Sequence, residues 1–421
     1  MRYERIKGTQ DIFGDEIDYW YFIEENARIV ANLYGYRELR TPIIEPTELF
    51  VRSVGEDTDI VQKEMYTFID KGGRSITLRP EGTAPTVRAF IENSMLNSGL
   101  PQRFFYIGPM FRYERPQAGR LRQFHQFGVE LIGSAHPSSD AEVLLLAEHF
   151  LNKIGVRDHV LHLNSIGCPK CRPVYRQKLK EYYESHVDEL CEDCKRRMET
   201  NVLRLLDCKI DVALAERAPK SFEFLCEECQ SHYDALRKRL YELGISFVED
   251  GTLVRGLDYY NRTVFEIRHK ELGAQNTILA GGRYDGLFAE LGGQSTPALG
   301  FACGIERLIL ALKIHGVQVP QKKACFAYVV CIGEKSSIEG FKIAEELRKR
   351  GVPTVTDVSD RKLTAQLRHA DKLGAKVALI LGDEELSRSV AHVKILDKFT
   401  QIEVSLDVAT DYIVELYRSN F

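Results

Sequence analysis

One stretch of the sequence, Phe111 to Gly133, constrains the fold more than any other. It carries four arginines within its first twelve residues and then alternates apolar and polar side chains. This alternation predicts two strands, over residues 102–113 and 122–133, joined by the loop ERPQAGRL, in which a proline and a glycine stop regular pairing. The sequence therefore predicts an antiparallel hairpin with a basic tip.

The second strand of this hairpin has two different faces. Gln126 and Glu130 fall on one face with Gly128 between them, and the intervening apolar residues fall on the other. Arg112 and Glu114 share a face of the preceding strand in the same way. We expect one face to pack in the core and the other to form a polar platform, with Gly128 leaving room for a ligand. On parity alone, a solvated charged hairpin is an equal alternative.

The overall composition limits the classes of protein that the chain can belong to. A length of 421 residues allows two or three domains, and no window reaches the roughly 18 apolar residues that a membrane span needs. The first residues, MRYERIKGTQ, contain no apolar signal-peptide core, so we expect a cytoplasmic protein whose ten cysteines are reduced thiols or metal ligands. The net charge of −4 gives no general attraction to nucleic acid, so a local basic cluster must meet any polyanion.

Changes in the pattern of residue types along the sequence divide the chain into domains. Charged helical segments with three CxxC pairs occupy about residues 164–243, which we interpret as an inserted subdomain. A glycine-rich turn, AGGRYDGLF, and a strand that passes into a helix, GFACGIERLILALKIHG, then return to the main body. After a polar linker, strands and helices alternate, which predicts a small α/β domain with a largely parallel sheet. The boundary is placed near Lys323, giving domains of residues 1–323 and 324–421.

Four further clusters carry residues suited to binding. In LRPEGTAPTVRAF, Glu81 and Thr83 can accept hydrogen bonds from an ammonium group, although Thr83 could instead cap the following helix. Arg255 lies beside a glycine in LVRGLDYYN, and Arg307 begins a helix in GFACGIERL, where amides and a guanidinium could jointly hold a phosphate. The consecutive glycines of AGGRYDG let the backbone come near a bound group. Taken singly, these signals are weak.

Taken together and in this order, the clusters resemble the histidyl-tRNA synthetase family. GYRELRTPIIEPTELF, FRYERPQAGRLRQFHQFGVE and GFACGIERL look like motifs 1, 2 and 3 of the class II aminoacyl-tRNA synthetases, and LVRGLDYYN and AGGRYDG look like the two signatures of the histidine enzymes. The resemblance runs from GTQDIFG to the carboxy-terminal α/β domain. It is specific because of the two histidine signatures.

The resemblance implies a fold, a reaction and partners. The fold is an α+β catalytic domain with the antiparallel sheet of class II synthetases, a helical insertion and a C-terminal α/β anticodon-binding domain. The reaction joins L-histidine and ATP, with Mg²⁺, to histidyl-adenylate and pyrophosphate, and then transfers histidine to the 3′ end of tRNA(His). The family works as a cytoplasmic homodimer without organic cofactor or membrane. Alternatives are an inactive paralogue, such as the ATP phosphoribosyltransferase regulatory subunit, and a synthetase for threonine, proline or glycine.

The resemblance also assigns residues to the nucleotide. Arg112 matches the arginine that holds the ATP α-phosphate, Arg120 the one that reaches the γ-phosphate, and Arg307 the one that clamps the nucleotide from the other side. Glu114 belongs to the same ATP site, and Arg255 matches the catalytic arginine at the α-phosphate and the substrate carboxylate. Fixed guanidinium groups at a developing charge stabilise a transition state without reorganising.

The remaining assignments concern the amino acid and the tRNA. Neutral imidazole offers one hydrogen-bond donor and one acceptor, so a pocket that reads it needs a carboxylate and a hydroxyl at fixed positions. Glu130 and Tyr260 match these, while Tyr284 helps to close the pocket. Arg115 and Gln117 are expected to read the tRNA acceptor end. The full histidine site by resemblance is Glu81, Thr83, Gln126, Glu130, Arg255, Tyr260 and Tyr284.

The cysteine pairs are not explained by the resemblance, because the family does not in general need a metal in its insertion. Three pairs and Cys208 could supply a four-thiolate zinc site with spare ligands. The alternative, which we favour from sequence, is a set of thiols on helices with no metal and sub-stoichiometric zinc in the purified protein. The pairs are Cys168/Cys171, Cys191/Cys194 and Cys226/Cys229.

Overall fold

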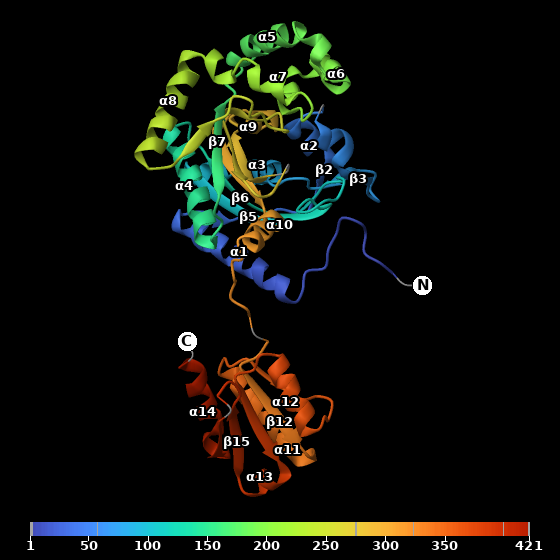
Figure 1. Ribbon diagram of the computed structural model, residues 1–421, viewed down its shortest axis with the longest axis vertical. Coiled ribbons are helices and arrows are strands. Elements are labelled where there is room, and N and C mark those ends of the chain that lie inside the picture. Colours follow the sequence, from blue (N-terminus) through green and yellow to red (C-terminus); the bar gives the residue numbers. More distant parts are fainter. Residues whose placement is uncertain (1–2, 57, 274–275, 323, 399, 420–421) are drawn as a thin grey trace. The chain divides into compact units, whose positions relative to one another are not determined.

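The computed structural model describes residues 3–56, 58–273, 276–322, 324–398 and 400–419 (Figure 1). The chain forms two compact units, Met1–Val319 and Pro320–Phe421, and each is described by itself. Lys323, near which the sequence analysis placed the boundary, lies outside the described residues. Among the described residues, no helix combines the length and apolar character that crossing a bilayer requires.

An eight-stranded sheet organises the first unit, in the order β1-β5-β6-β11-β10-β9-β7-β8. Only the pairs at its two edges, β1 with β5 and β7 with β8, are parallel. The predicted hairpin is confirmed as the antiparallel pair β5 and β6. The strands are β1 (Arg37–Glu38), β5 (Gln102–Phe111), β6 (Gln123–Ile132), β7 (His159–Ser165), β8 (Phe247–Glu249), β9 (Asn261–His269), β10 (Thr277–Arg283) and β11 (Ala298–Gly304).

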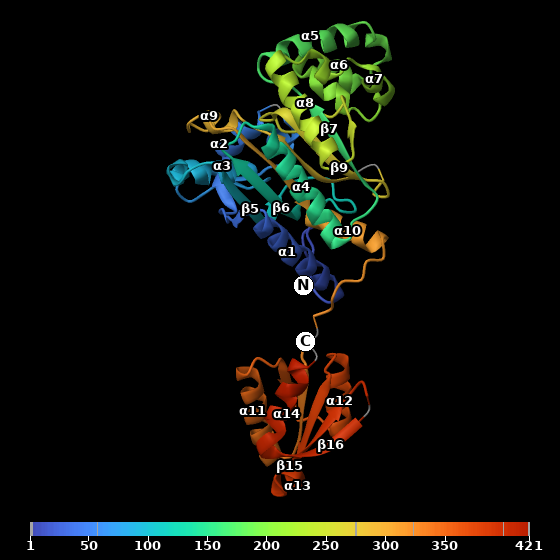
Figure 2. The ribbon, with the colours of Figure 1, turned by 90° about the vertical axis from the view of Figure 1, so that its left-hand side faces the viewer.

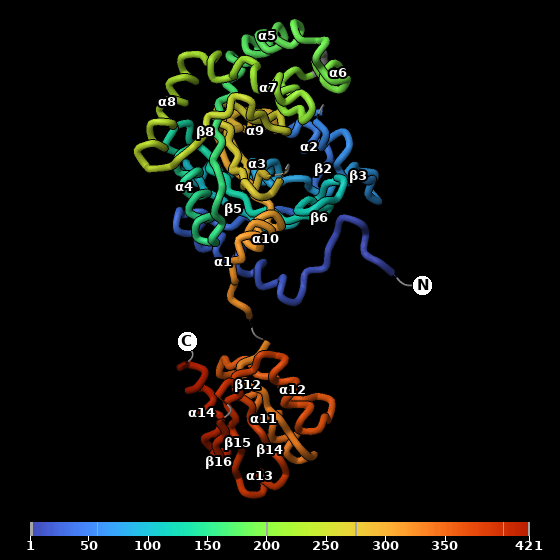
Figure 3. Tube along the Cα trace, in the orientation of Figure 1, coloured from blue at the N-terminus to red at the C-terminus, as the bar shows by residue number. Residues whose placement is uncertain are grey.

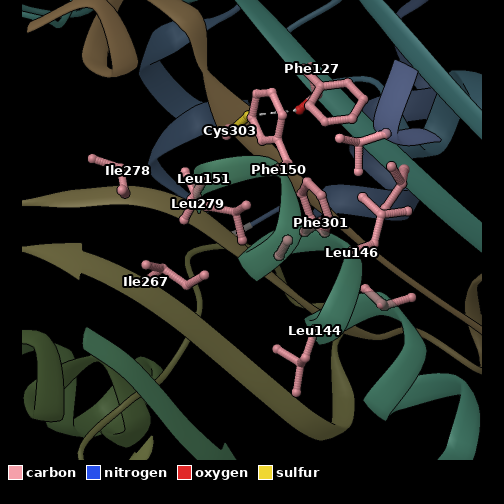
Figure 4. Close-up of a cluster of buried hydrophobic side chains, with 14 of the residues drawn as sticks. Phe127, Leu144, Leu146, Phe150, Leu151, Ile267, Ile278, Leu279, Phe301 and Cys303 are labelled. Carbon is pink, nitrogen blue, oxygen red and sulfur yellow. Dashed lines mark hydrogen bonds between the residues drawn. The ribbon is translucent and has the colours of Figure 1, made fainter. Parts of the chain in front are cut away.

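Helices α1 (Asp15–Leu33), α4 (Pro137–Ile154) and α10 (Ile305–Ile314) pack against one face of this sheet (Figure 2). The largest buried cluster lies between them, and Figure 4 shows its aromatic centre, where the Phe127 ring lies 4.9 Å from Phe150 and 5.8 Å from Phe301. Phe127, Val129 and Leu131 all belong to this cluster. The apolar face that parity predicted for β6 is therefore confirmed as core.

The opposite face of the sheet carries a second layer. Helix α3 (Thr83–Glu92) contributes Val87 and Phe90 to a cluster that includes Ile132 of β6. A small sheet in the order β2-β4-β3 and four short helical segments complete this layer. Its other elements are β2 (Ile44–Pro46), α2 (Thr47–Val54), the π-helix Ile60–Glu64, β3 (Tyr66–Ile69), β4 (Ser75–Leu78), the 3₁₀ helix Met95–Ser98 and α9 (Leu287–Glu290).

The insertion between β7 and β8 is helical, as predicted, and most of it packs on a small core of its own (Figure 1). Its last helix differs, because Tyr233, Leu236 and Leu240 of α8 join the main core beside α4. The helices are α5 (Cys171–Glu184), α6 (Glu192–Thr200), α7 (Val212–Arg217) and α8 (Glu227–Glu242), with 3₁₀ turns at Val187–Glu189, Val202–Asp207 and Ser221–Phe224.

We predicted a turn at the sequence AGGR, but it lies inside strand β10. A Cβ added at Gly281 would come within 2.1 Å of the Gly300 carbonyl oxygen on β11, and one at Gly282 within 2.5 Å of the Thr263 carbonyl oxygen on β9. The glycines are therefore needed because the neighbouring strands approach closely. The buried Arg283 that follows donates to Asp140 of α4 at 2.6 Å and holds the strand to that helix.

The second unit has the alternating strands and helices that the sequence predicted (Figure 3). Its sheet has the order β13-β12-β14-β15-β16, and β14, β15 and β16 pair antiparallel, so the sheet is less parallel than we expected. The elements are β12 (Ala327–Ile332), α11 (Glu334–Lys349), β13 (Thr354–Thr356), α12 (Leu363–Lys372), β14 (Val377–Gly382), α13 (Asp383–Ser387), β15 (Val390–Ile395), β16 (Thr400–Ser405) and α14 (Leu406–Arg418).

Candidate active site

A cavity of about 300 Å³ lies on the polar face of the large sheet. It is lined from the β5–β6 hairpin, the start of α3, the segment before β9, strands β9 and β11, the first half of β10 and the start of α10. Residues distant in sequence thus meet in one place. The predicted site residues that line it are Glu81, Thr83, Arg112, Glu114, Arg120, Gln126, Arg255, Tyr260, Tyr284 and Arg307.

Glu130 lies beneath this cavity and supports two of its walls. Its carboxyl group accepts a hydrogen bond from Thr83 Oγ1 at 2.7 Å and another from the Tyr284 hydroxyl. Only 1% of Glu130 is exposed, and this burial raises the pKa of its carboxyl group to about 8. The site therefore contains a carboxyl group that hydroxyl donors hold in place and that burial inclines to keep its proton.

Glu81 lies two residues before helix α3 and lines the cavity. Its two carboxylate oxygens accept the backbone N–H groups of Thr83 at 2.6 Å and Ala84 at 2.8 Å. Burial raises the pKa of Glu81. Because the Thr83 hydroxyl donates to Glu130 instead, the capping role that we weighed for Thr83 belongs to Glu81.

Gly128 does not leave room for a ligand, contrary to our expectation. The ring of Tyr106 from β5 fills that space, and a Cβ at Gly128 would come within 2.3 Å of Tyr106 Cζ. Gln126, two residues earlier on the same face, does line the cavity, and its Oε1 is buried without a hydrogen-bond partner among the described residues. A polar atom buried in this way is suited to an external donor.

The hairpin supplies two arginines to the cavity. Arg112 donates from Nε to the Pro80 carbonyl at 2.9 Å, and its guanidinium lies 5.4 Å from the centroid of the Phe124 ring. Arg120 forms an ion pair with Glu114. Burial lowers the pKa of both arginines, but a guanidinium remains charged at physiological pH.

Arg307 reaches the cavity from the start of α10. Its Nη1 donates to the Thr277 carbonyl on β10 at 2.7 Å, and its Nε donates to the Gly119 carbonyl on the hairpin loop at 3.3 Å. It therefore connects the loop to the opposite side of the site, and its predicted contact with the nucleotide stays a prediction.

Arg255 is paired with Glu266 of β9, a cavity residue that the sequence analysis missed. Glu266 also accepts from Arg268 Nε at 2.9 Å and from Thr277 Oγ1 at 3.0 Å. The Nε of Arg255 is buried and has no hydrogen-bond partner within the described ranges. The signal for Glu266 was present, because it is a charged residue between Phe265 and Ile267 in an alternating strand.

Arg115 and Gln117 lie outside the set that lines the cavity. Both are exposed on the hairpin loop, where the Gln117 and Arg120 backbones exchange hydrogen bonds of 3.1 and 2.9 Å. Their predicted contact with the tRNA acceptor end stays a prediction.

Comparison with known proteins decides the family. Residues 8–308 match the family described as histidyl-tRNA synthetase, and residues 327–416 match an anticodon binding domain. The chain belongs to the histidyl-tRNA synthetase family. The fold is thus that of a class II synthetase with an appended anticodon-binding domain, as the resemblance implied.

Relatives of this synthetase match it over almost its whole length. It is 59% identical to the histidine–tRNA ligase of Thermotoga maritima, over 99% of both chains, and 59% identical to that of Pseudothermotoga lettingae, over 99% and 96%. The apo histidyl-tRNA synthetase of S. aureus superposes with a TM-score of 0.83 at 38% identity, covering 98% of this chain and 100% of that one. Close ligase relatives over the full length support histidine–tRNA ligase activity over the regulatory-subunit alternative.

Proposed function

We propose that the synthetase activates L-histidine with ATP in this cavity and transfers it to the 3′ end of tRNA(His). The observation that carries the proposal is the joining, in one cavity, of a hydrogen-bonded carboxyl floor with four arginines. The first group suits a polar side chain such as imidazole, and the second suits a triphosphate. A cytoplasmic location, a homodimer and the absence of a membrane partner are proposed from the family resemblance.

In this proposal the floor of the cavity recognises imidazole. The carboxyl group of Glu130 accepts the imidazole N–H, while Tyr260, whose ring packs 4.6 Å from Tyr259, supplies the hydroxyl on the other side. Thr83 and Tyr284 already fix the orientation of Glu130. A side chain without matching polar groups would leave these buried groups unpaired, which can cost a factor of about 10⁴ in selectivity.

The α-amino group of histidine is proposed to lie between Glu81 and Gln126. Glu81 is held by the first turn of α3, and Gln126 offers its unpartnered buried Oε1. An ammonium group has three donors and no acceptor, so it pairs with two such oxygens and with the Thr83 hydroxyl. This contact fixes the carboxylate of histidine toward Arg255.

Adenylation follows when that carboxylate meets the α-phosphorus of ATP. A carboxylate oxygen attacks phosphorus, the bond to the bridging oxygen breaks, and pyrophosphate leaves with the electron pair. Arg255 and Arg112 are the proposed catalytic residues at the α-phosphate, and the free Nε of Arg255 offers a donor that needs no rearrangement. Arg120 and Arg307 are proposed to hold the outer phosphates.

Mg²⁺ bound to ATP fits the same cavity. Glu114 and Glu266 line it and offer carboxylate oxygens, which this ion prefers. Mg²⁺ supplies charge neutralisation on the phosphates. Both carboxylates are paired with arginines in the structure, so the arginines would exchange carboxylate for phosphate when the nucleotide binds.

Transfer requires tRNA at two places. Arg115 and Gln117 on the exposed hairpin loop are proposed to contact the acceptor end. The domain that matches residues 327–416 is proposed to contact the anticodon. Because the chain has a net charge of −4, these contacts depend on local rather than overall charge.

Pyrophosphate exchange with each of the twenty amino acids tests the proposed substrate. We expect exchange with histidine that exceeds every other amino acid by about 10³-fold or more, because the buried polar groups of the site discriminate strongly. The Glu130→Ala variant removes the carboxyl group that is proposed to bind imidazole and should lose most of this preference. Equal exchange with threonine, proline or glycine would contradict the assignment, and no exchange at all would favour the inactive paralogue.

A further inference from the structure

Two of the three cysteine pairs in the insertion meet in space. The sulfur atoms of Cys168, Cys171, Cys226 and Cys229, here the Cys₄ cluster, all lie within 4.8 Å of one another. Cys168 Sγ lies 3.7 Å from Cys171 Sγ and 3.8 Å from Cys226 Sγ. The first pair lies at the start of α5 and the second at the start of α8, so the cluster joins the two ends of the insertion.

These distances fit a metal site and not disulfide bonds. A disulfide needs a sulfur–sulfur distance of about 2.05 Å. Four thiolates at about 2.3 Å from a zinc ion form a tetrahedron whose edges are about 3.8 Å. The 3.7 and 3.8 Å separations equal that edge.

The backbone around the Cys₄ cluster supports thiolates. The amide of Cys226 donates to Cys171 Sγ at 3.1 Å, the kind of outer hydrogen bond that orients metal ligands. Cys171 N and Arg172 N both donate to the Cys168 carbonyl, at 2.9 and 3.1 Å, which closes the CxxC turn. Gly167 has a φ of +68°, and a Cβ there would come within 2.5 Å of Cys171 Cβ, so the turn needs glycine.

We propose that the Cys₄ cluster binds a structural zinc ion. This reverses the alternative that we favoured from the sequence, because the sequence did not show that the pairs at 168/171 and 226/229 meet. Four thiolates in a tetrahedron leave no open position, which is typical of a structural and not a catalytic zinc site. The ion closes the base of the insertion where its first and last helices leave the catalytic sheet.

Three further cysteines and an aspartate form a second candidate metal site within the insertion. Cys191, Cys194, Cys208 and Asp211, here the Cys₃Asp cluster, also place one ligand atom each within 4.8 Å of the others. Cys191 Sγ lies 3.8 Å from Cys208 Sγ, again the edge of a zinc–thiolate tetrahedron. Asp211 N donates to Cys208 Sγ at 3.4 Å, and the Asp211 carboxylate accepts from Cys191 N at 3.1 Å. We infer a second zinc ion there, with three thiolates and one carboxylate.

The small core of the insertion explains why metal would be useful. Its helices are strongly polar, and its buried cluster contains few large side chains beyond Tyr175, Tyr183 and several leucines. Small domains with limited cores commonly gain stability from metal ions. Every cysteine between residues 164 and 243 belongs to one of the two clusters, whereas Cys303, Cys325 and Cys331 are buried elsewhere.

Elemental analysis of the full chain, purified without chelator or added metal, tests both sites. We expect two zinc ions per unaltered chain, and one ion in each of Cys226→Ser and Cys191→Ser. Cys331→Ser, which alters a buried cysteine of β12, is the control and should keep both ions. If a variant keeps the zinc content of the unaltered chain, the cluster that it alters is not a zinc site. If the protein contains iron in place of zinc, the assignment of the metal is wrong.

A second measurement on the unaltered chain keeps the test decisive if a variant fails to fold. Zinc is removed with chelator and replaced by Co²⁺, and the spectrum is recorded. We expect intense thiolate-to-cobalt bands in the near ultraviolet and visible bands typical of tetrahedral cobalt, both abolished by added zinc. Two results together overturn both proposals. The first is a spectrum of hexaaqua cobalt, and the second is a chain that retains no zinc after it is refolded in the presence of zinc. Neither readout depends on the aminoacylation reaction.

Discussion

Replacing Arg255 by alanine should slow adenylation far more than any other step. The change removes the unpartnered buried Nε and the whole guanidinium from a cavity where the α-phosphate is proposed to lie. Loss of one fixed donor of this type costs about 10²–10³-fold in rate. Arg255→Lys should recover little of this, because an ammonium group cannot make the planar two-pronged contact.

The structure also predicts that the variant folds. Leaving a buried carboxylate unpaired costs about 3–5 kcal/mol. Glu266, however, keeps Arg268 at 2.9 Å and Thr277 at 3.0 Å when Arg255 is removed. Its charge stays compensated, so the loss of stability should fall below that range. Replacing Glu266 as well, in Arg255→Ala/Glu266→Gln, should therefore raise the stability above that of Arg255→Ala by no more than about 1–2 kcal/mol.

Single-turnover measurements separate the two chemical steps. Adenylation is followed with ATP and histidine, and transfer is followed from preformed histidyl-adenylate to tRNA. Transfer should change by only a few-fold in Arg255→Ala, because the phosphate is then part of the leaving group. Arg268→Ala is the matched control, since it removes the other partner of Glu266 but does not line the cavity. An adenylation rate within a few-fold of the unaltered protein would show that Arg255 is only structural.

Three further predictions concern pH, the second domain and salt. Since burial raises the pKa of Glu130 from an ordinary 4.5 to about 8, its contribution to stability is complete below pH 4.5 and is lost as pH rises toward 8. The unfolding temperature of the unaltered protein should therefore fall relative to that of Glu130→Gln between pH 5 and pH 8, and parallel curves would contradict this. Ending the chain at Val319 should abolish most tRNA charging but leave adenylation largely intact. The tRNA is followed by filter binding and adenylation by pyrophosphate exchange, and equal losses in the two assays would count against the second unit as the anticodon domain. The logarithm of tRNA affinity should fall linearly with the logarithm of salt concentration, with a slope of about −0.9 or smaller in magnitude per neutralised phosphate, and a flat plot would exclude local phosphate contacts.

The platform of the active site was predictable because strand parity is a local property. Alternation in β6 placed Phe127 in the core and Gln126 on the opposite face without knowledge of any other strand. The same reasoning applied to β9 would have identified Glu266. Residue roles in binding were drawn from family resemblance, since charge and spacing alone allowed a solvated hairpin.

Features that depend on neighbouring elements were not predictable in this way. Gly128 makes room for Tyr106, and Gly281 for the β11 backbone, so neither glycine could be interpreted from its own strand. The pairing of Cys168 with Cys226 depends on how the insertion returns to the sheet. Each case requires the three-dimensional position of a segment that is far away in sequence.

The late return of β11 to β6 has a consequence for synthesis on the ribosome. Their pairing runs from Ala298 with Ile132 to Gly304 with Gln126, and the contact between Cys303 and Phe127 spans 176 residues. At about 5–20 residues per second, the nascent hairpin waits on the order of 10–35 s for its partner strand. During that interval β6 presents an unpaired edge, which can recruit other strands. We expect chaperone contact with the nascent chain to concentrate between the emergence of β6 and that of β11, and the active site to assemble only afterwards.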